Sequence, residues 1–161
     1  MTTEEHREIE MIYELLKESI TRHLEETMPL IEQLSKVDIM EKPAPEAREL
    51  GEVVLHMLRS MEFYMKGVAT GEWESLPYSL ETYDSAEAII QLAHEVFERV
   101  SAFNRVISSS DMNRTVDSFS RPATVSEIIL EMLEHSIHHR GQITVYYRLL
   151  GIKPVPISYI V

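Results

Sequence analysis

The chain has 161 residues, no cysteine and a formal net charge of −12, from 15 Lys and Arg against 27 Asp and Glu. This charge disfavours binding to nucleic acid or anionic membranes through a broad basic surface, and the lack of cysteine excludes disulfides and thiolate metal ligands. The N-terminal stretch MTTEEHREIEMIYELL lacks the basic start and apolar run of a signal peptide, so we expect one soluble, cytoplasmic domain over residues 1–161.

The first predicted element is a long amphipathic helix over residues 5–34, where apolar side chains recur three or four positions apart. Pro29 lies inside this segment and is predicted to kink or break the helix near Thr27. The stretch VDIMEKPAPEAR follows, and its Pro43 and Pro45 predict a connector rather than a helix.

The second and third helices are predicted over residues 46–68 and 85–107, again from apolar periodicity. Asp84, with Glu87 three residues later, is the expected N-cap of the third helix. The stretches ATGEWESLPYSLETYD and SSSDMNRTVDSFSRPA are longer than minimal hairpin loops. We therefore expect them either to cross the bundle or to border a site.

The fourth helix is predicted to begin at a capping box formed by Thr124 and Glu127 and to end at Leu150, before Gly151. The tail IKPVPISYIV is apolar, and we expect it to pack as an extended cap. No segment shows the alternation of a β-strand. The predicted fold is therefore all-α: a four-helix bundle with long connecting loops and a short packed C-terminal tail.

The fourth helix contains LEHSIHHRGQ, which places three histidines within five residues. Since a helix turns about 100° per residue, direction follows from spacing. His135 and His139 fall within the apolar stripe of this helix, whereas His138 lies about 60° from His135, on its margin. The stripe is defined by Val125, Ile128, Met132, Ile143, Tyr146 and Leu150.

Two imidazoles at positions i and i+4 on an inward face can converge on one metal ion. The alternative is that both are buried histidines hydrogen-bonded to neighbouring helices. Ser136 follows His135, so the glutamate base of an HExxH enzyme is missing. A metal site would need at least one further ligand.

His56, in GEVVLHMLRS, is the best candidate for that ligand because it lies at the border of the apolar face of the second helix. His23 lies near the apolar stripe of the first helix and is the reserve candidate. His94 points about 120° away from its helix's apolar face, into solvent, and His6 lies in a terminus expected to fray. Three histidine ligands would leave positions open for water or substrate, as in catalytic sites.

Two segments, LGEVVLHML and the later ILEMLEHSIHHRGQITVYYRLLG, resemble the DinB-like superfamily of damage-inducible bacterial four-helix-bundle proteins. In that family a histidine of the second helix and two of the fourth, four apart, bind a divalent metal. The resemblance therefore implies that His56, His135 and His139 are metal ligands, with zinc or nickel the ions most readily found. It also implies a homodimer.

The better understood relatives are S-transferases that use low-molecular-weight thiols. The resemblance thus implies a metal-dependent transferase or hydrolase in which a metal-bound thiol or water attacks a small electrophile. The alternative is a non-catalytic, metal-binding stress-response protein with a structural or sensory site. No residue is identified as catalytic.

Other residues of the motif have expected roles around the ligands. Gln142 and His138 are candidates to surround the site, as is Tyr146, for which a core position is the simpler expectation. Arg140, about 140° from His135, is expected at the surface or in an interhelix salt bridge. Gly141 is expected to permit close helix packing, and the nine methionines to fill the core.

Overall fold

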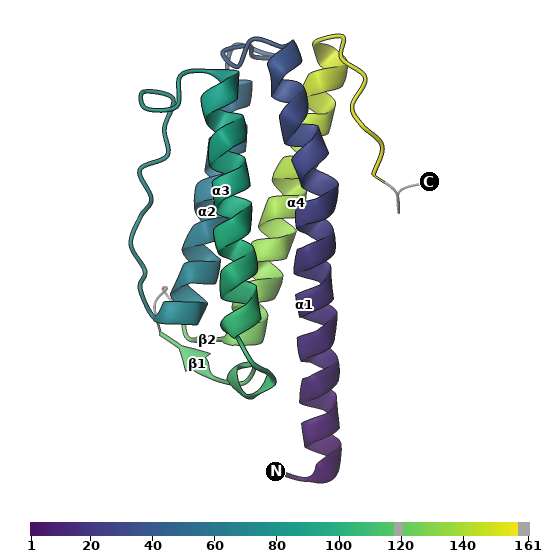
Figure 1. The fold of residues 1–161 in the computed structure, drawn as a ribbon, viewed down its shortest axis with the longest axis vertical. Helices are drawn as coiled ribbons and strands as arrows, with labels where there is room; N and C mark the ends of the chain where they lie inside the picture. The colour runs from purple at the N-terminus through teal and green to yellow at the C-terminus, as the bar shows by residue number, and fades with distance from the viewer. Residues whose placement is uncertain (118–120, 158–161) are drawn as a thin grey trace.

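Four long helices form the bundle in the computed structural model, which describes residues 1–117 and 121–157 (Figure 1). The predicted all-α four-helix architecture is confirmed. The helices are α1 (Thr3–Glu32), α2 (Leu50–Thr70), α3 (Ala86–Val106) and α4 (Val125–Leu149). The minor elements are the 3₁₀ turns η1 (Gln33–Lys36) and η2 (Ser109–Asp111) and the strands β1 (Thr115–Val116) and β2 (Ala123–Thr124).

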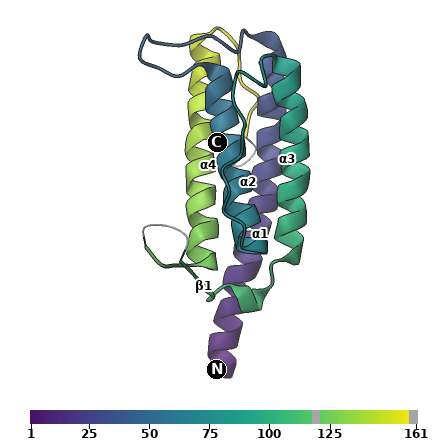
Figure 2. The same ribbon diagram turned by 90° about the vertical axis from the view of Figure 1, so that its left-hand side faces the viewer.

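The connection between α2 and α3, residues 71–85, crosses the whole length of the bundle (Figures 1 and 2). Consequently α2 and α3 run in the same direction, and α1 and α4 run in the opposite one. The connection between α3 and α4 stays at one end of the bundle and contains the antiparallel β1–β2 pair. This pair of two-residue strands was not expected from the sequence.

The predicted break near Thr27 is wrong, because α1 continues through Pro29 to Glu32. Proline removes one backbone donor from a helix. Here the loss is the one bond that the nitrogen of residue 29 would donate to the Glu25 carbonyl, and the helix continues for three more residues before it tightens into η1. The first helix therefore runs unbroken to Glu32, and its N-terminal turns project beyond the other three helices (Figure 1).

The second helix begins four residues later than predicted, at Leu50. The amide of Leu50 donates to the Glu41 carbonyl at 3.0 Å, and the amide of Gly51 donates to the Ile39 carbonyl at 2.8 Å. The connector thus satisfies two of the donors that the first helical turn leaves unpaired. This fixes residues 44–49 as a loop above the start of α2.

Capping was predicted correctly for α4 and incorrectly for α3. Thr124 and Glu127 form the expected capping box of α4. The N-cap of α3 is Ser85, whose hydroxyl accepts from the Ala88 amide, and not Asp84. Both hydroxyl and carboxylate side chains can cap, so the sequence alone does not separate adjacent candidates.

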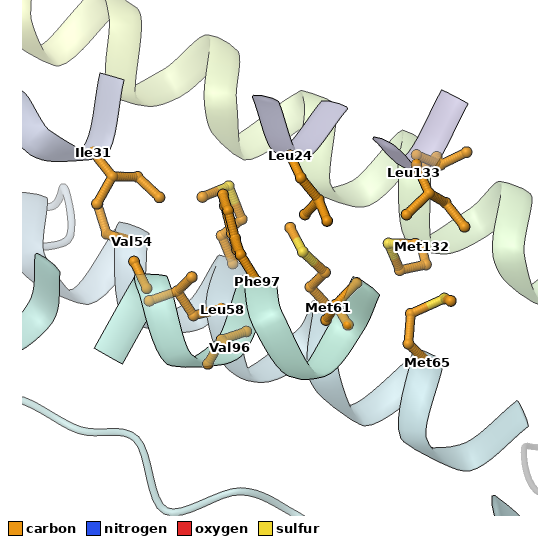
Figure 3. Packing of buried hydrophobic residues seen from close by; sticks show 14 of the residues in the cluster. Leu24, Ile31, Val54, Leu58, Met61, Met65, Val96, Phe97, Met132 and Leu133 are labelled. Atoms are coloured by element: carbon orange, nitrogen blue, oxygen red, sulfur yellow. The ribbon is translucent and has the colours of Figure 1, made fainter. Parts of the chain in front are cut away.

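The core lies between the four helices and contains several methionines, as expected (Figure 3). Met61 and Met65 of α2 lie there with Met132 of α4. The tail is also anchored as expected: Gln33 donates to the Lys153 carbonyl and accepts from the Val155 amide. The last four residues, 158–161, lie outside the described residues.

Gly141 does not serve close helix packing, because a Cβ built there would meet nothing within 4 Å. We expect Gly141→Ala to stabilise the protein by about 1 kcal/mol, since alanine loses less backbone entropy in a helix. Gly67→Ala is the contrasting variant: its Cβ would lie 2.2 Å from the Trp73 ring, so we expect destabilisation. Urea unfolding of both variants checks these opposite signs.

None of the helices in the described ranges is long and apolar enough to cross a membrane. Large apolar side chains are nevertheless exposed on the outer faces of α1 and α4. These exposed side chains do not by themselves establish an interface between two chains. The homodimer stays a prediction, and light scattering coupled to size-exclusion chromatography tests it. The exposed residues on these helices are Met11, Ile12, Leu15, Leu130, Ile137, Val145 and Leu149.

Candidate metal centre

Three histidines from two helices gather in one place. His56 projects from α2, and His135 and His139 project from α4 one turn apart. The Nε2 atom of His135 lies 3.2 Å from that of His56 and 3.1 Å from that of His139. Among the described residues this is the one group of three His, Asp or Glu side chains whose ligand atoms all lie within 4.8 Å of one another.

Neighbouring side chains fix the protonation of two of these rings. His139 Nδ1 lies 2.8 Å from Gln142 Oε1, so the ring donates from Nδ1 and keeps a lone pair on Nε2. Arg59 Nη2, which can only donate, lies 3.3 Å from His56 Nδ1. In a neutral His56 this contact places the proton on Nε2, facing His135.

The resulting contacts cannot all be hydrogen bonds. If His135 Nε2 accepts from His56, its lone pair also faces the lone pair of His139 Nε2 at 3.1 Å. A shared cation removes this conflict. Two ligand atoms at the zinc–nitrogen distance of about 2.0–2.1 Å in tetrahedral geometry lie about 3.3 Å apart, close to the observed spacings. The residues present therefore fit a divalent cation, provided that Arg59 leaves His56 Nδ1 when that ring ligates through Nε2.

The rings are held in their neutral, ligand-competent form. Burial lowers the pKa of His56 to about 4, helped by His139, His135 and the nearby arginines. Burial is also the largest cause of the lowered pKa of His135 and of His139. Because a metal competes with protons for imidazole nitrogen, a lowered pKa favours metal binding near neutral pH.

Two cavities open on either side of the histidines, and His56 lines both. The Arg59 cavity, of about 410 Å³, lies between α2, α4 and residues 75–76 of the crossing connection. The Arg48 cavity, of about 420 Å³, lies between α2, α4 and residues 47–48. The first is lined by His56, Arg59, Ser60, Phe63, Tyr64, Ser75, Leu76 and His135, and the second by Ala47, Arg48, Val53, His56, His138, His139, Gln142 and Tyr146.

A buried carboxylate holds the crossing connection, which forms one wall of the Arg59 cavity, against the bundle. Glu62 of α2 accepts from Tyr78 Oη at 2.6 Å and from Arg99 Nε of α3 at 2.6 Å. Arg59 adds a bond from Nη1 to the Tyr78 carbonyl at 2.8 Å and an ion pair with Glu52 at 2.6 Å. The crossing connection thus borders the site, as the sequence analysis expected of a loop this long.

The three residues expected around the ligands all line the Arg48 cavity. His138 is exposed, with its ring centroid 5.1 Å from that of His139, and it lines the Arg48 cavity. Gln142 contacts His139 directly. Tyr146 is half-buried, lines the same cavity and donates from its hydroxyl to the Arg48 carbonyl at 3.1 Å.

The reserve ligand His23 belongs to a different cluster. It is buried, with Nε2 2.7 Å from Ser136 Oγ and Nδ1 3.1 Å from Arg140 Nη1. Of the two positions expected for Arg140, the surface one is wrong, because this side chain is only 2% exposed, whereas its contact with His23 of α1 does join two helices. His94 and His6 are both exposed, as expected.

The His23 cluster predicts acid sensitivity. Burial, then the charge of Arg140, lowers the pKa of His23 from 6.5 to about 3. Below pH 6.5 the unfolded chain binds a proton that the folded protein refuses, so stability is full above this pH and falls towards pH 3. We expect His23→Gln to remove about 1.4 kcal/mol per pH unit from that slope. Urea unfolding between pH 6.5 and 4.5 measures it, and equal slopes in both proteins would refute this expectation.

Arg48 and Arg59, which give the cavities their names, were not predicted from the sequence as site residues. Arg59 follows His56 by three residues, so shared helical phase could have identified it. Arg48 lies in a loop, where periodicity carries no information. Ser75 and Leu76 reach the site only through the crossing connection.

Three histidines converge between the second and fourth helices of this bundle. Fold and site together define the class of this protein, a helical bundle with a candidate metal centre between two helices. The chain belongs to the DinB family, whose family model matches residues 3–161. It is 26% identical over 137 residues to the uncharacterized protein YjoA of Bacillus subtilis strain 168, covering 83% of this chain and 88% of the relative.

Solved structures of DinB-like proteins share the fold. That of YjoA from Bacillus subtilis has a TM-score of 0.73 at 24% identity, with 88% of this chain and 95% of the other covered. That of a DinB-like protein from Bacillus cereus also has a TM-score of 0.73, at 26% identity, covering 88% and 94%. These relatives support the predicted family and fold.

Proposed function

We propose that the protein binds one divalent metal ion through His56, His135 and His139 and acts as a metal-dependent enzyme on a small electrophilic molecule. The observation that carries this proposal is the position of the three histidines. Their Nε2 atoms converge in the wall between two open cavities. A structural metal site is closed by protein ligands, whereas a catalytic site keeps a position open.

A divalent cation held there lowers the pKa of a coordinated thiol or water and so supplies a nucleophile near neutral pH. The chain's own groups orient the site: Gln142 fixes the tautomer of His139. The residues that line the two cavities include no Asp or Glu, so these cavities offer no carboxylate general base. Transfer of a thiol to an electrophile fits this donor set better than a reaction that requires such a base.

The experiment is a turnover assay on protein loaded with one equivalent of Zn²⁺, Ni²⁺, Mn²⁺ or Co²⁺. Monochlorobimane is the electrophile, and several low-molecular-weight thiols are compared. We expect thiol-dependent turnover that is lost in His135→Ala and retained in His94→Ala, which removes an exposed imidazole outside both cavities. Metal binding without turnover of any thiol would instead support the non-catalytic, metal-binding stress protein. Testing several ions matters because affinity order does not reveal the physiological metal.

A further inference from the structure

We propose that the Arg48 cavity is a carboxylate subsite, in which Arg48 binds the anionic end of a small ligand whose other end reaches the three histidines. This inference rests on the proposed function, because it names the class of substrate that the site takes. Residues 37–49, which include Arg48, project beside the C-terminal end of α4 (Figure 2). The cavity lies towards that end of α4, where His139, Gln142 and Tyr146 line it.

Arg48 is available for a ligand. Its guanidinium forms no hydrogen bond or ion pair within the described residues, although the chain carries 27 acidic residues. Arg59 shows the contrast, since Glu52 and the Tyr78 carbonyl already occupy it. A guanidinium presents a planar fork of donors that matches a carboxylate in two parallel hydrogen bonds.

The backbone of Arg48 is held in place at the rim of the cavity. The Tyr146 hydroxyl donates to the Arg48 carbonyl at 3.1 Å, which ties the loop to α4. The next residue, Glu49, is the N-cap of α2, whose first two amides donate to the Glu41 and Ile39 carbonyls. The backbone of Arg48 and of the residues that follow it is thus held in place. When a ligand binds, only the Arg48 side chain has to become ordered.

Charge balance favours an anion in this cavity. Arg48 lines the same cavity as His56 and His139. A divalent cation beside this guanidinium would concentrate positive charge next to a cavity whose lining includes no carboxylate. A ligand that carries its own negative charge relieves this concentration. The cavity volume of about 420 Å³ falls within the range of small-molecule sites.

The Arg59 cavity suits the other reactant. Its lining combines Phe63, Tyr64 and Leu76 with two serines, and its arginine is already paired. An apolar electrophile can pack against these aromatic rings without leaving a charge unpaired. The histidines would then stand between an anionic thiol on one side and an apolar partner on the other.

The test compares two thiols of similar size on the Co²⁺-loaded protein: 3-mercaptopropionate, which is anionic, and 2-mercaptoethanol, which is neutral. The thiolate-to-cobalt absorption band reports binding. We expect the wild type to bind the anionic thiol at least about tenfold more tightly, the equivalent of one strong charge-assisted contact. Arg48→Met should remove this preference and leave the affinity for mercaptoethanol unchanged. Arg105→Met, which removes an exposed charge elsewhere, should keep it.

The outcomes separate this inference from the proposed function. If both thiols bind but Arg48→Met keeps the preference of the wild type, the subsite is wrong and the metal chemistry stands. If neither thiol gives the band, thiol activation fails, and calorimetric titration of the Zn²⁺-loaded protein with succinate decides on the subsite. Succinate binding that Arg48→Met abolishes supports the subsite. Binding that is absent, or equal in both proteins, overturns it.

Discussion

Alanine at any one of His56, His135 or His139 is expected to weaken Zn²⁺ binding by more than about 100-fold, which exceeds the effect of losing a residue that only supports a ligand. Each substitution removes one of three convergent Nε2 donors and leaves two, too few for a stable site. Competition with a chromophoric chelator at pH 7.5 measures the dissociation constants.

His138→Ala is the matched control for these variants. It removes an imidazole from the same turn of α4, but His138 is exposed and lies outside the convergent group. We expect its dissociation constant to stay within about tenfold of the wild type. A His138→Ala protein that loses as much metal as His139→Ala would show that the helical phase assigned to these residues is wrong.

Removal of metal is expected to have the second large effect, on stability. A ligand that binds only the folded state stabilises it by about 4 kcal/mol at a free concentration 1,000 times its dissociation constant. For a chain of this size that corresponds to a rise in Tm of roughly 8–16 °C. Differential scanning fluorimetry of metal-free protein, with and without Zn²⁺ at that excess, measures the shift.

The His135→Ala/His139→Ala protein serves as the control for the stability experiment. It should unfold at the same temperature with and without Zn²⁺, because only His56 of the convergent group remains. A comparable rise in this variant would mean that zinc stabilises the protein through another site. No rise in the wild type would mean that the histidines bind zinc too weakly to matter.

The gathering of the three histidines could be predicted because helical periodicity fixes direction. His135 and His139 share a stripe with Ile128 and Met132, and that stripe faces α2, where His56 lies. The same rule failed for Arg140. It assumes one inward face, whereas α4 packs on both α1 and α2, so its buried arc is wide enough to include Arg140 and Ser136.

The rest of the site depends on contacts that no local pattern encodes. Arg48 lines the cavity beside the histidines because hydrogen bonds from the amides of Leu50 and Gly51 set where its loop ends. Ser75 and Leu76 line the Arg59 cavity because Glu62 accepts a hydrogen bond from Tyr78 of the crossing connection. Neither interaction produces a periodic pattern in the sequence, because each joins segments that are separated along the chain. The two cavities therefore could not be predicted from the sequence.

The most direct test of the metal centre is anomalous scattering from crystals of protein loaded with one equivalent of Zn²⁺, with data collected on both sides of the zinc absorption edge. The account predicts one strong peak in each chain, about 2.0–2.1 Å from Nε2 of His56, His135 and His139. It also predicts Arg59 turned away from His56 Nδ1. A peak held by other residues, or three histidines still in mutual contact with no zinc between them, would contradict it.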